Sequence, residues 1–382
     1  MHRRNATLFS HSLLIVTLFA LTASAWQPPT PESVAALRLP REKLLCYRAE
    51  DGTIADVTNI DQWLQRRSEI ERGVITVMGF LPGQEKKCDL AMEILEQVDC
   101  GRYLRRRITY MSEPGCRVPA YLCIPTELLR SEKPSQAPAI LCLHSTDQQV
   151  GHGSVVGLGA PFHRNYASEL AERGYVTLAP SYPLLANYQP DLAVLGWESG
   201  TLKAVWDNIR GIDLLETLPF VKPGPVAAIG HSLGGHNSVY TAFFDDRIAA
   251  VVSSCGLDSY LDYYDGNPEV WMPERGWTQT RYMPRLASYR GRLEEIPFDF
   301  HELIGSLAPR RVMIVAPLGD DNFRAASVDR IAAAAREVYQ LYDKPSHLQV
   351  LHPDCKHDFP DDAREAAYRW IDQTLLGDRD RR

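Results

Sequence analysis

The chain has 382 residues, of which 45% are hydrophobic, so it can bury the core of one large α/β domain with insertions or of two ordinary domains. Its formal net charge at pH 7 is -7, and no basic stripe runs along the sequence. Binding to nucleic acid is therefore not expected.

The first 25 residues have the composition of a cleavable signal peptide. Arg3 and Arg4 precede the apolar stretch 13–21, and small residues follow it up to Ala25. We therefore expect cleavage after Ala25 and export to the periplasm or the extracellular space. No later stretch is apolar enough to span a bilayer, so we expect no membrane contact after cleavage.

The chain contains eight cysteines, and an exported chain can form disulfides. Cys142 and Cys255 fall in predicted core strands, where cysteine usually packs as a small hydrophobe. Connectivity cannot be read from sequence. The expected bridges, if any form, join Cys88 with Cys100, or Cys116 with Cys123.

Residues 26–102 are predicted to form an N-terminal helical extension. The stretch is rich in proline at first and then has helical spacing up to Val74, with Asp61 as the expected helix cap and Arg66 on the solvent side. We expect this extension to pack on a catalytic domain spanning residues 103–382.

The catalytic domain is predicted to begin with a β-hairpin. Two β-rich runs, 103–111 and 118–124, flank the turn sequence EPG at 113–115. After it, apolar strands and helical stretches alternate. The expected strands are 139–144, 175–179, 226–230, 248–254, 311–316 and 348–351, and the expected helices are 162–173, 200–218, 327–342 and 363–376. This α/β pattern predicts a mostly parallel sheet of about eight strands with helices on both faces.

A long insertion, about 257–308, separates two of the predicted strands and is rich in tyrosine and tryptophan. A segment of this length predicts a lid or a wall of a substrate pocket. Trp277, Arg281 and Tyr282 are the candidate substrate-binding residues, with Arg281 suited to a carboxylate. Alternatively, the aromatic residues form the core of the insertion itself, and Arg281 pairs with one of its acids.

The pentapeptide GHSLG at 230–234 lies between an apolar run and a helical stretch. A Gly-x-Ser-x-Gly sequence in this context is typical of a nucleophile elbow, in which small residues allow a sharp turn and leave the serine hydroxyl accessible. Ser232 is therefore the candidate nucleophile. The N–H group of Leu233, at the start of the following helix, is a candidate donor to an oxyanion.

A serine nucleophile needs a histidine base and an acid that orients it, and in this kind of fold they follow the serine in the order acid, histidine. Asp320 after the strand 311–316 is the expected acid, with Asp321 as the alternative. His357 is the expected base, because His352 still belongs to the preceding strand end. The second oxyanion donor is expected in the loop after the strand 139–144, at Thr146 or, as the second choice, at Ser145.

A metal site is not expected. His352, Cys355 and His357 have ligand side chains, but no fourth ligand follows at a usable spacing. We expect no cofactor, and the sequence does not indicate an oligomeric state.

The sequence around 230–235, 316–320 and 357–360 resembles the α/β-hydrolase superfamily. Within it, the chain is similar to secreted bacterial proteins related to dienelactone hydrolase, acetyl xylan esterase and the catalytic domain of the prolyl oligopeptidases. The resemblance implies the α/β-hydrolase fold and hydrolysis of an acyl bond. Dienelactone hydrolases carry cysteine where this chain has Ser232, and the N-terminal residues are too few for the β-propeller of a prolyl oligopeptidase.

The expected function is that of a secreted serine carboxylesterase acting on a carbohydrate or small-molecule ester through an acyl-enzyme intermediate. The alternatives are a serine peptidase with the same catalytic residues and a hydrolase-fold binding protein without activity.

Overall fold

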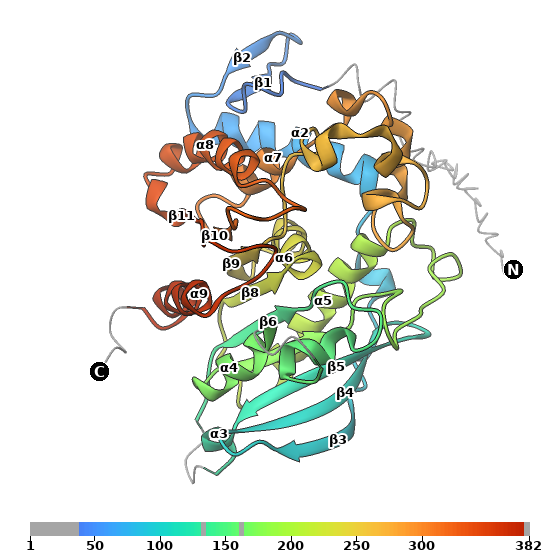
Figure 1. Cartoon of the computed structure of the whole chain (residues 1–382), viewed down its shortest axis with the longest axis vertical. Coiled ribbons are helices and arrows are strands. Elements are labelled where there is room, and N and C mark those ends of the chain that lie inside the picture. Colours follow the sequence, from blue (N-terminus) through green and yellow to red (C-terminus); the bar gives the residue numbers. More distant parts are fainter. Residues whose placement is uncertain (1–37, 131–134, 160–163, 378–382) are drawn as a thin grey trace, which may run out of the picture.

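The computed structural model describes residues 38–130, 135–159 and 164–377, and the expected signal peptide lies outside these ranges. The described part contains a nine-stranded sheet (Figure 1). In spatial order its strands are β11 (Leu348–Leu351), β10 (Arg311–Val315), β9 (Ile248–Ser254), β8 (Val226–His231), β6 (Ala139–Leu143), β7 (Val176–Pro180), β5 (Cys116–Pro125), β4 (Tyr103–Glu113) and β3 (Glu93–Asp99).

The six strands from β11 to β7 are parallel, and β5, β4 and β3 extend the sheet in antiparallel fashion. The sheet therefore begins at β3, inside the segment that was expected to be a helical extension. β3 was missed because it is an edge strand whose residues are almost all exposed, so it lacks the buried alternation that marks a strand in sequence.

Helices cover both faces of the sheet. α4 (Tyr166–Glu172) and α9 (Asp361–Leu375) pack on one face. The other face carries α5 (Gly200–Thr217), α6 (Leu233–Phe244) and α8 (Ala325–Leu341). Along β9, Val251 joins the core of one face, and its neighbours Ala250 and Val252 join the other. Burial on both faces explains why the central strands are continuous apolar runs.

The remaining elements are short or lie outside the sheet. They are the paired strands β1 (Cys46–Arg48) and β2 (Ile54–Asp56), the helices α2 (Ile60–Met78), α3 (Thr126–Arg130) and α7 (Phe300–Ser306), and the 3₁₀ turns η1 (Gln84–Lys86), η2 (Gly151–Val156), η4 (Tyr263–Gly266), η5 (Pro268–Trp271), η6 (Gly276–Thr278), η7 (Pro284–Tyr289), η8 (Leu293–Glu295) and η9 (Pro345–His347). No helix in the described ranges is long and apolar enough to cross a membrane.

The cap of α2 lies two residues earlier than Asp61, the expected cap. The Asn59 side chain accepts a hydrogen bond from the N–H group of Gln62 and so caps the helix. Arg66, expected on the solvent side, is 4% exposed. Its guanidinium is buried because it forms an ion pair with Glu302 of α7, a partner that a helical pattern cannot reveal.

The insertion between β9 and β10 packs against the N-terminal segment (Figure 1). Arg38 and Arg66 form ion pairs with the buried carboxylate of Glu302, and Arg41 forms one with Asp299. α2 approaches so closely that a Cβ at Gly73 would lie 2.8 Å from the Pro297 carbonyl oxygen. The N-terminal segment therefore braces the insertion through buried ion pairs and close backbone packing.

All eight cysteines lie within the described residues, and all are free thiols. Cys116 and Cys123 are on the same strand, β5, and a rise of about 3.3 Å per residue puts them about 23 Å apart. That expected bridge is therefore wrong. Cys88 and Cys100, the other expected pair, are also unbridged.

Glu302 makes stability sensitive to acid. Burial alone would raise the pKa of its carboxyl group, but Arg38, His301 and Arg66 lower that pKa to about 2. The pKa is thus lower in the folded chain than its ordinary value of 4.5, so the carboxylate stabilises the fold above about pH 4.5 and this contribution is lost as pH falls toward 2.

We predict that Glu302→Gln destabilises the protein by about 3–5 kcal/mol at pH 7, because buried arginines lose their counter-charge. The variant should also lose much of the acid sensitivity between pH 4.5 and 2. Urea unfolding at several pH values measures both effects. Glu295→Gln, which removes only a surface pair with Arg292, is the control. Equal costs for the two substitutions would contradict the prediction.

Candidate active site

Ser232 lies in the sharp turn between β8 and α6. Its backbone has φ 55° and ψ -121°, a strained conformation for a residue with a side chain. A Cβ at Gly230 would lie 2.2 Å from the Gly234 carbonyl carbon, and a Cβ at Gly234 would lie 1.9 Å from the Leu143 carbonyl oxygen. Both glycines are thus required sterically, as the GHSLG pattern predicted.

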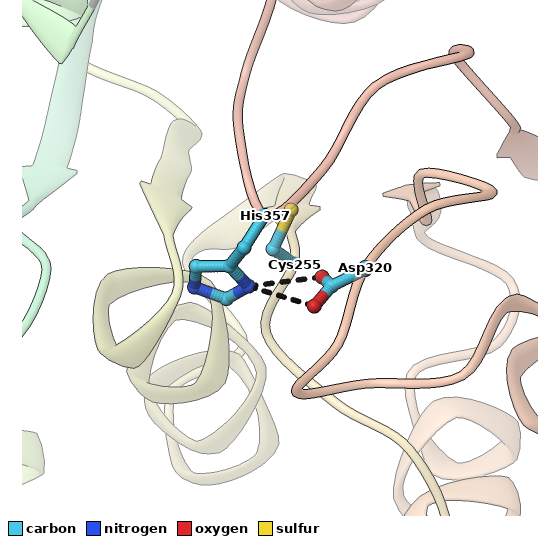
Figure 2. Close-up of side chains that lie close together, drawn as sticks. All are labelled: Cys255, Asp320 and His357. Carbon is cyan, nitrogen blue, oxygen red and sulfur yellow. Dashed lines mark hydrogen bonds and ion pairs between the residues drawn. The ribbon is translucent and has the colours of Figure 1, made fainter.

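The three side chains predicted to act together do meet. The Ser232 hydroxyl lies 2.9 Å from His357 Nε2, and His357 Nδ1 lies 2.9 Å and 3.0 Å from the two carboxylate oxygens of Asp320. Figure 2 shows the imidazole and the carboxylate facing each other. With Nδ1–H donated to the carboxylate, Nε2 keeps its lone pair toward the serine hydroxyl.

Asp320, rather than Asp321, faces the histidine. Its carboxylate accepts hydrogen bonds from the backbone N–H groups of Asn322 and Phe323, and the side chain is 1% exposed, whereas Asp321 points to solvent. Burial alone would raise the pKa of Asp320, but the His357 contact and the two N–H donors hold it below its usual value. Asp320 is therefore ionised at neutral pH.

The loops that carry the acid and the base are tied together by their backbones. The N–H group of Gly319 donates to the carbonyl of Cys355 at 3.0 Å, and that of Leu318 donates to Pro353 at 3.1 Å. His352 is held elsewhere, by the Ala316 carbonyl and by Asp329, so it lies outside the Ser232 site. These contacts fix the spacing between Asp320 and His357.

The predicted oxyanion donors have N–H groups available. In the described part of the chain, the N–H groups of Leu233 and Thr146 make no hydrogen bond with protein. The loop that carries Thr146 is ordered by His144, whose Nδ1 contacts the Ser145 carbonyl and whose Nε2 accepts from the N–H of Tyr182. Burial lowers the pKa of His144 to about 4, so it stays neutral and suits a structural role.

The aromatic residues of the insertion mostly form its own core. Trp277 is 6% exposed, and its ring is stacked on His236 at 4.1 Å and on Phe323 at 6.1 Å. Its faces are thus largely covered, and the expected stacking of a substrate on Trp277 does not fit this packing. Tyr282 is also buried, but its hydroxyl lies 3.1 Å from that of Thr146, beside the oxyanion loop.

Arg281 and Tyr282 are held by main-chain contacts with the start of α5. The Gly200 and Thr201 N–H groups donate to the carbonyls of Thr280 and Tyr282, and a Cβ at Gly200 would lie 2.3 Å from the Arg281 carbonyl oxygen. The half-buried Arg281 guanidinium lies 6.0 Å from the Tyr282 ring centre and has no ion pair with any described residue. It is therefore a cation free to meet an anionic or polar group.

Two residues near the site were not found from the sequence. Phe323 donates its N–H to Asp320, and its ring centre lies 5.9 Å from that of His357. The Cys255 thiol packs beside Asp320 and His357 at the end of β9. The one sequence feature that could have indicated them is their position, because both residues lie after the carboxyl ends of predicted strands.

Three comparisons with known proteins were informative. Residues 197–343 match the family described as glucuronyl esterase, fungi. The chain is 26% identical over 269 residues to the protein YtaP of Bacillus subtilis (strain 168), covering 68% of this chain and 84% of that protein. It is 27% identical over 190 residues to 4-O-methyl-glucuronoyl methylesterase 1 of Wolfiporia cocos (strain MD-104), but spans only 46% of each chain.

Among solved structures, the glucuronoyl esterase from Solibacter usitatus aligns with a TM-score of 0.67 at 19% identity, over 88% of this chain and 98% of that one. This similarity shows the fold. The chain has the α/β-hydrolase fold, and the comparisons make it a carboxylic ester hydrolase of the serine type.

Strain at Ser232 gives a testable prediction. Glycine tolerates φ 55° without strain, so Ser232→Gly should be more stable than Ser232→Ala by about 1 kcal/mol, since relief of about 1–3 kcal/mol exceeds the entropic cost of glycine. Thermal unfolding measures the difference. Ser238, in the middle of α6, is the control, and there glycine should be the less stable of the two. The same order at both positions would contradict the prediction.

Proposed function

We propose that this carboxylic ester hydrolase of the α/β-hydrolase fold cleaves the ester of a sugar acid with an alcohol, and that it does so by transient acylation of Ser232. The observation that carries the mechanism is the continuous hydrogen-bonded chain from Ser232 Oγ through His357 to Asp320. The match to the glucuronyl esterase family over 197–343, which includes Ser232 and Asp320, supports the substrate class.

In the first step, His357 Nε2 takes the hydroxyl proton as Ser232 Oγ attacks the ester carbonyl carbon. Asp320 stabilises the resulting imidazolium and keeps the ring oriented. The N–H groups of Leu233 and Thr146 donate to the oxyanion. The alcohol leaves with the proton from His357, and water then cleaves the acyl-serine by the same route, which releases the acid.

The insertion supplies the substrate wall in this proposal. Arg281 and Tyr282 contact the acyl part, and Trp277 supports them from within the insertion's core. A free guanidinium suits the oxygen-rich face of a sugar acid and the carboxylate of the released product. The backbone contacts at 280–282 hold this wall rigidly, so the insertion acts as a fixed wall of the substrate pocket.

We also propose that the protein is exported and acts on a carbohydrate outside the cell. The support is the composition of residues 1–25, which is that of a cleavable signal peptide. A sugar-acid ester in a polymer is accessible only to an enzyme that leaves the cell.

A substrate panel tests the proposal. The methyl ester of 4-O-methylglucuronic acid should be hydrolysed with a higher kcat/KM than p-nitrophenyl acetate or acetylated xylan, and aminoacyl anilides should not be hydrolysed. A fluorophosphonate probe should label Ser232. Turnover restricted to acetyl esters would reject the sugar-acid substrate, anilide turnover would favour a peptidase, and absence of labelling would favour a binding protein.

The choice of acid gives a second prediction. Asp320→Asn should reduce kcat by about 10³–10⁴-fold, because an amide stabilises neither the imidazolium nor the correct tautomer. The exposed neighbour provides a matched control, and Asp321→Asn should stay near the wild-type rate. Steady-state kinetics on the preferred ester would reveal the reverse pattern if Asp321 were the acid.

A further inference from the structure

The Cys255 thiol takes no part in the mechanism above, yet it lies against the catalytic pair. Cys255 Sγ, an oxygen of Asp320 and a ring nitrogen of His357 all lie within 4.8 Å of one another. Figure 2 shows the cysteine on the side of the imidazole that faces Asp320. Cys255 itself is 2% exposed and has a left-handed backbone, with φ 47°, so its thiol is enclosed by protein beside the catalytic pair.

This group combines the three side-chain types that bind Zn²⁺ and related thiophilic ions. Such an ion binds sulfur at about 2.3 Å and nitrogen or oxygen at about 2.0–2.2 Å, which places tetrahedral ligands about 3.5 Å apart. The three ligand atoms lie up to 4.8 Å apart, so the largest separation needs to close by about 1.3 Å, which small side-chain rotations can supply. The ionised carboxylate of Asp320 adds the negative charge that attracts a cation.

We propose that Cys255, Asp320 and His357 form an inhibitory site for a thiophilic divalent cation such as Zn²⁺ or Cd²⁺. The ion replaces the hydrogen bond between His357 and Asp320. The thiol loses its proton to solvent, and the imidazole proton moves from Nδ1 to Nε2 as the ion takes the Nδ1 lone pair. One proton is therefore released for each ion bound.

The consequence for catalysis follows from the tautomer. With a proton on Nε2, the imidazole donates to Ser232 Oγ and has no lone pair with which to accept the serine proton. The hydroxyl is then no longer activated. Inhibition is reversible, because it involves no covalent change to the protein, and a chelator should restore activity. This part of the inference rests on the proposed serine mechanism, whereas metal binding itself does not.

The chain offers a matched control. Cys355 is a half-buried thiol two residues before His357, but it is not part of the group of three. Cys255 lies deeper, with its thiol directed at the Asp358 carbonyl at 3.3 Å, and burial raises its pKa above the ordinary value. If the metal ion bound any thiol near His357, removal of either cysteine would weaken binding. The proposed site requires the Cys255 thiol and does not require the Cys355 thiol.

Binding is tested first, without reference to activity. Reduced, metal-free Ser232→Ala protein is titrated with Cd²⁺ while the sulfur-to-metal charge-transfer absorption is recorded. We expect the absorption band to saturate at one equivalent of Cd²⁺. The band should be lost when Ser232→Ala is combined with Cys255→Ala or Cys255→Ser, and it should be kept when Ser232→Ala is combined with Cys355→Ser. Near-UV circular dichroism confirms that each variant is folded. A band that survives removal of Cys255, or disappears with Cys355→Ser, would overturn the site.

Inhibition is tested by the rate at which a fluorophosphonate labels Ser232. Cd²⁺ should slow labelling of the wild-type protein and of Cys355→Ser by about tenfold or more, with recovery in EDTA, and should have much less effect on Cys255→Ser. Each variant is compared with its own metal-free rate. If the probe does not label Ser232 in the metal-free protein, the proposed function is wrong. The metal site is then still tested by the Cd²⁺ absorption titration, which does not depend on activity. Equal inhibition of wild type and Cys255→Ser would reject the inference.

Discussion

The close approach of the backbone at Gly234 to the backbone at Leu143 is the constraint on which the site depends. A single added carbon at residue 234 would lie 1.9 Å from the Leu143 carbonyl oxygen. This contact places the start of α6 directly beside the loop that follows β6. Ser232, the N–H group of Leu233 and the Thr146 loop therefore occupy one corner of the sheet, at the carboxyl ends of parallel strands. His357 and Asp320 reach the same corner because their strands, β11 and β10, lie in the same parallel array.

Much of this arrangement could be predicted from the sequence. The central strands are buried on both faces, so they appear as uninterrupted apolar runs, and the polar residues that follow them are the ones that form the site. The elbow is a local steric pattern, which explains why Gly230, Ser232 and Gly234 were found with little context. Asp320, the preferred candidate for the acid, contacts His357, whereas its neighbour Asp321 is exposed.

Other features depend on tertiary contacts that leave no periodic signal. β3 is paired on one edge only and is exposed, so its sequence resembles a loop. Arg66 looks like a solvent-facing residue of α2 until Glu302 is placed opposite it. The expected bridge from Cys116 to Cys123 was wrong because both residues lie on one strand. This could be recognised only once the strand was known to begin at Cys116. Composition could not decide between core and substrate wall for the insertion's aromatic residues, and Trp277 lies in the core.

The main-chain anchoring of residues 280–282 on the start of α5 separates the shape of the proposed substrate wall from its chemistry. Since peptide groups hold this segment on α5, its position depends mainly on the backbone and little on the side chain at 281. Natural selection, or a laboratory library, can exchange that side chain and so alter ligand preference at little cost to folding. Gly200 cannot be exchanged in this way, because the side chain of any larger residue would collide with the backbone of residue 281 and displace the segment 280–282.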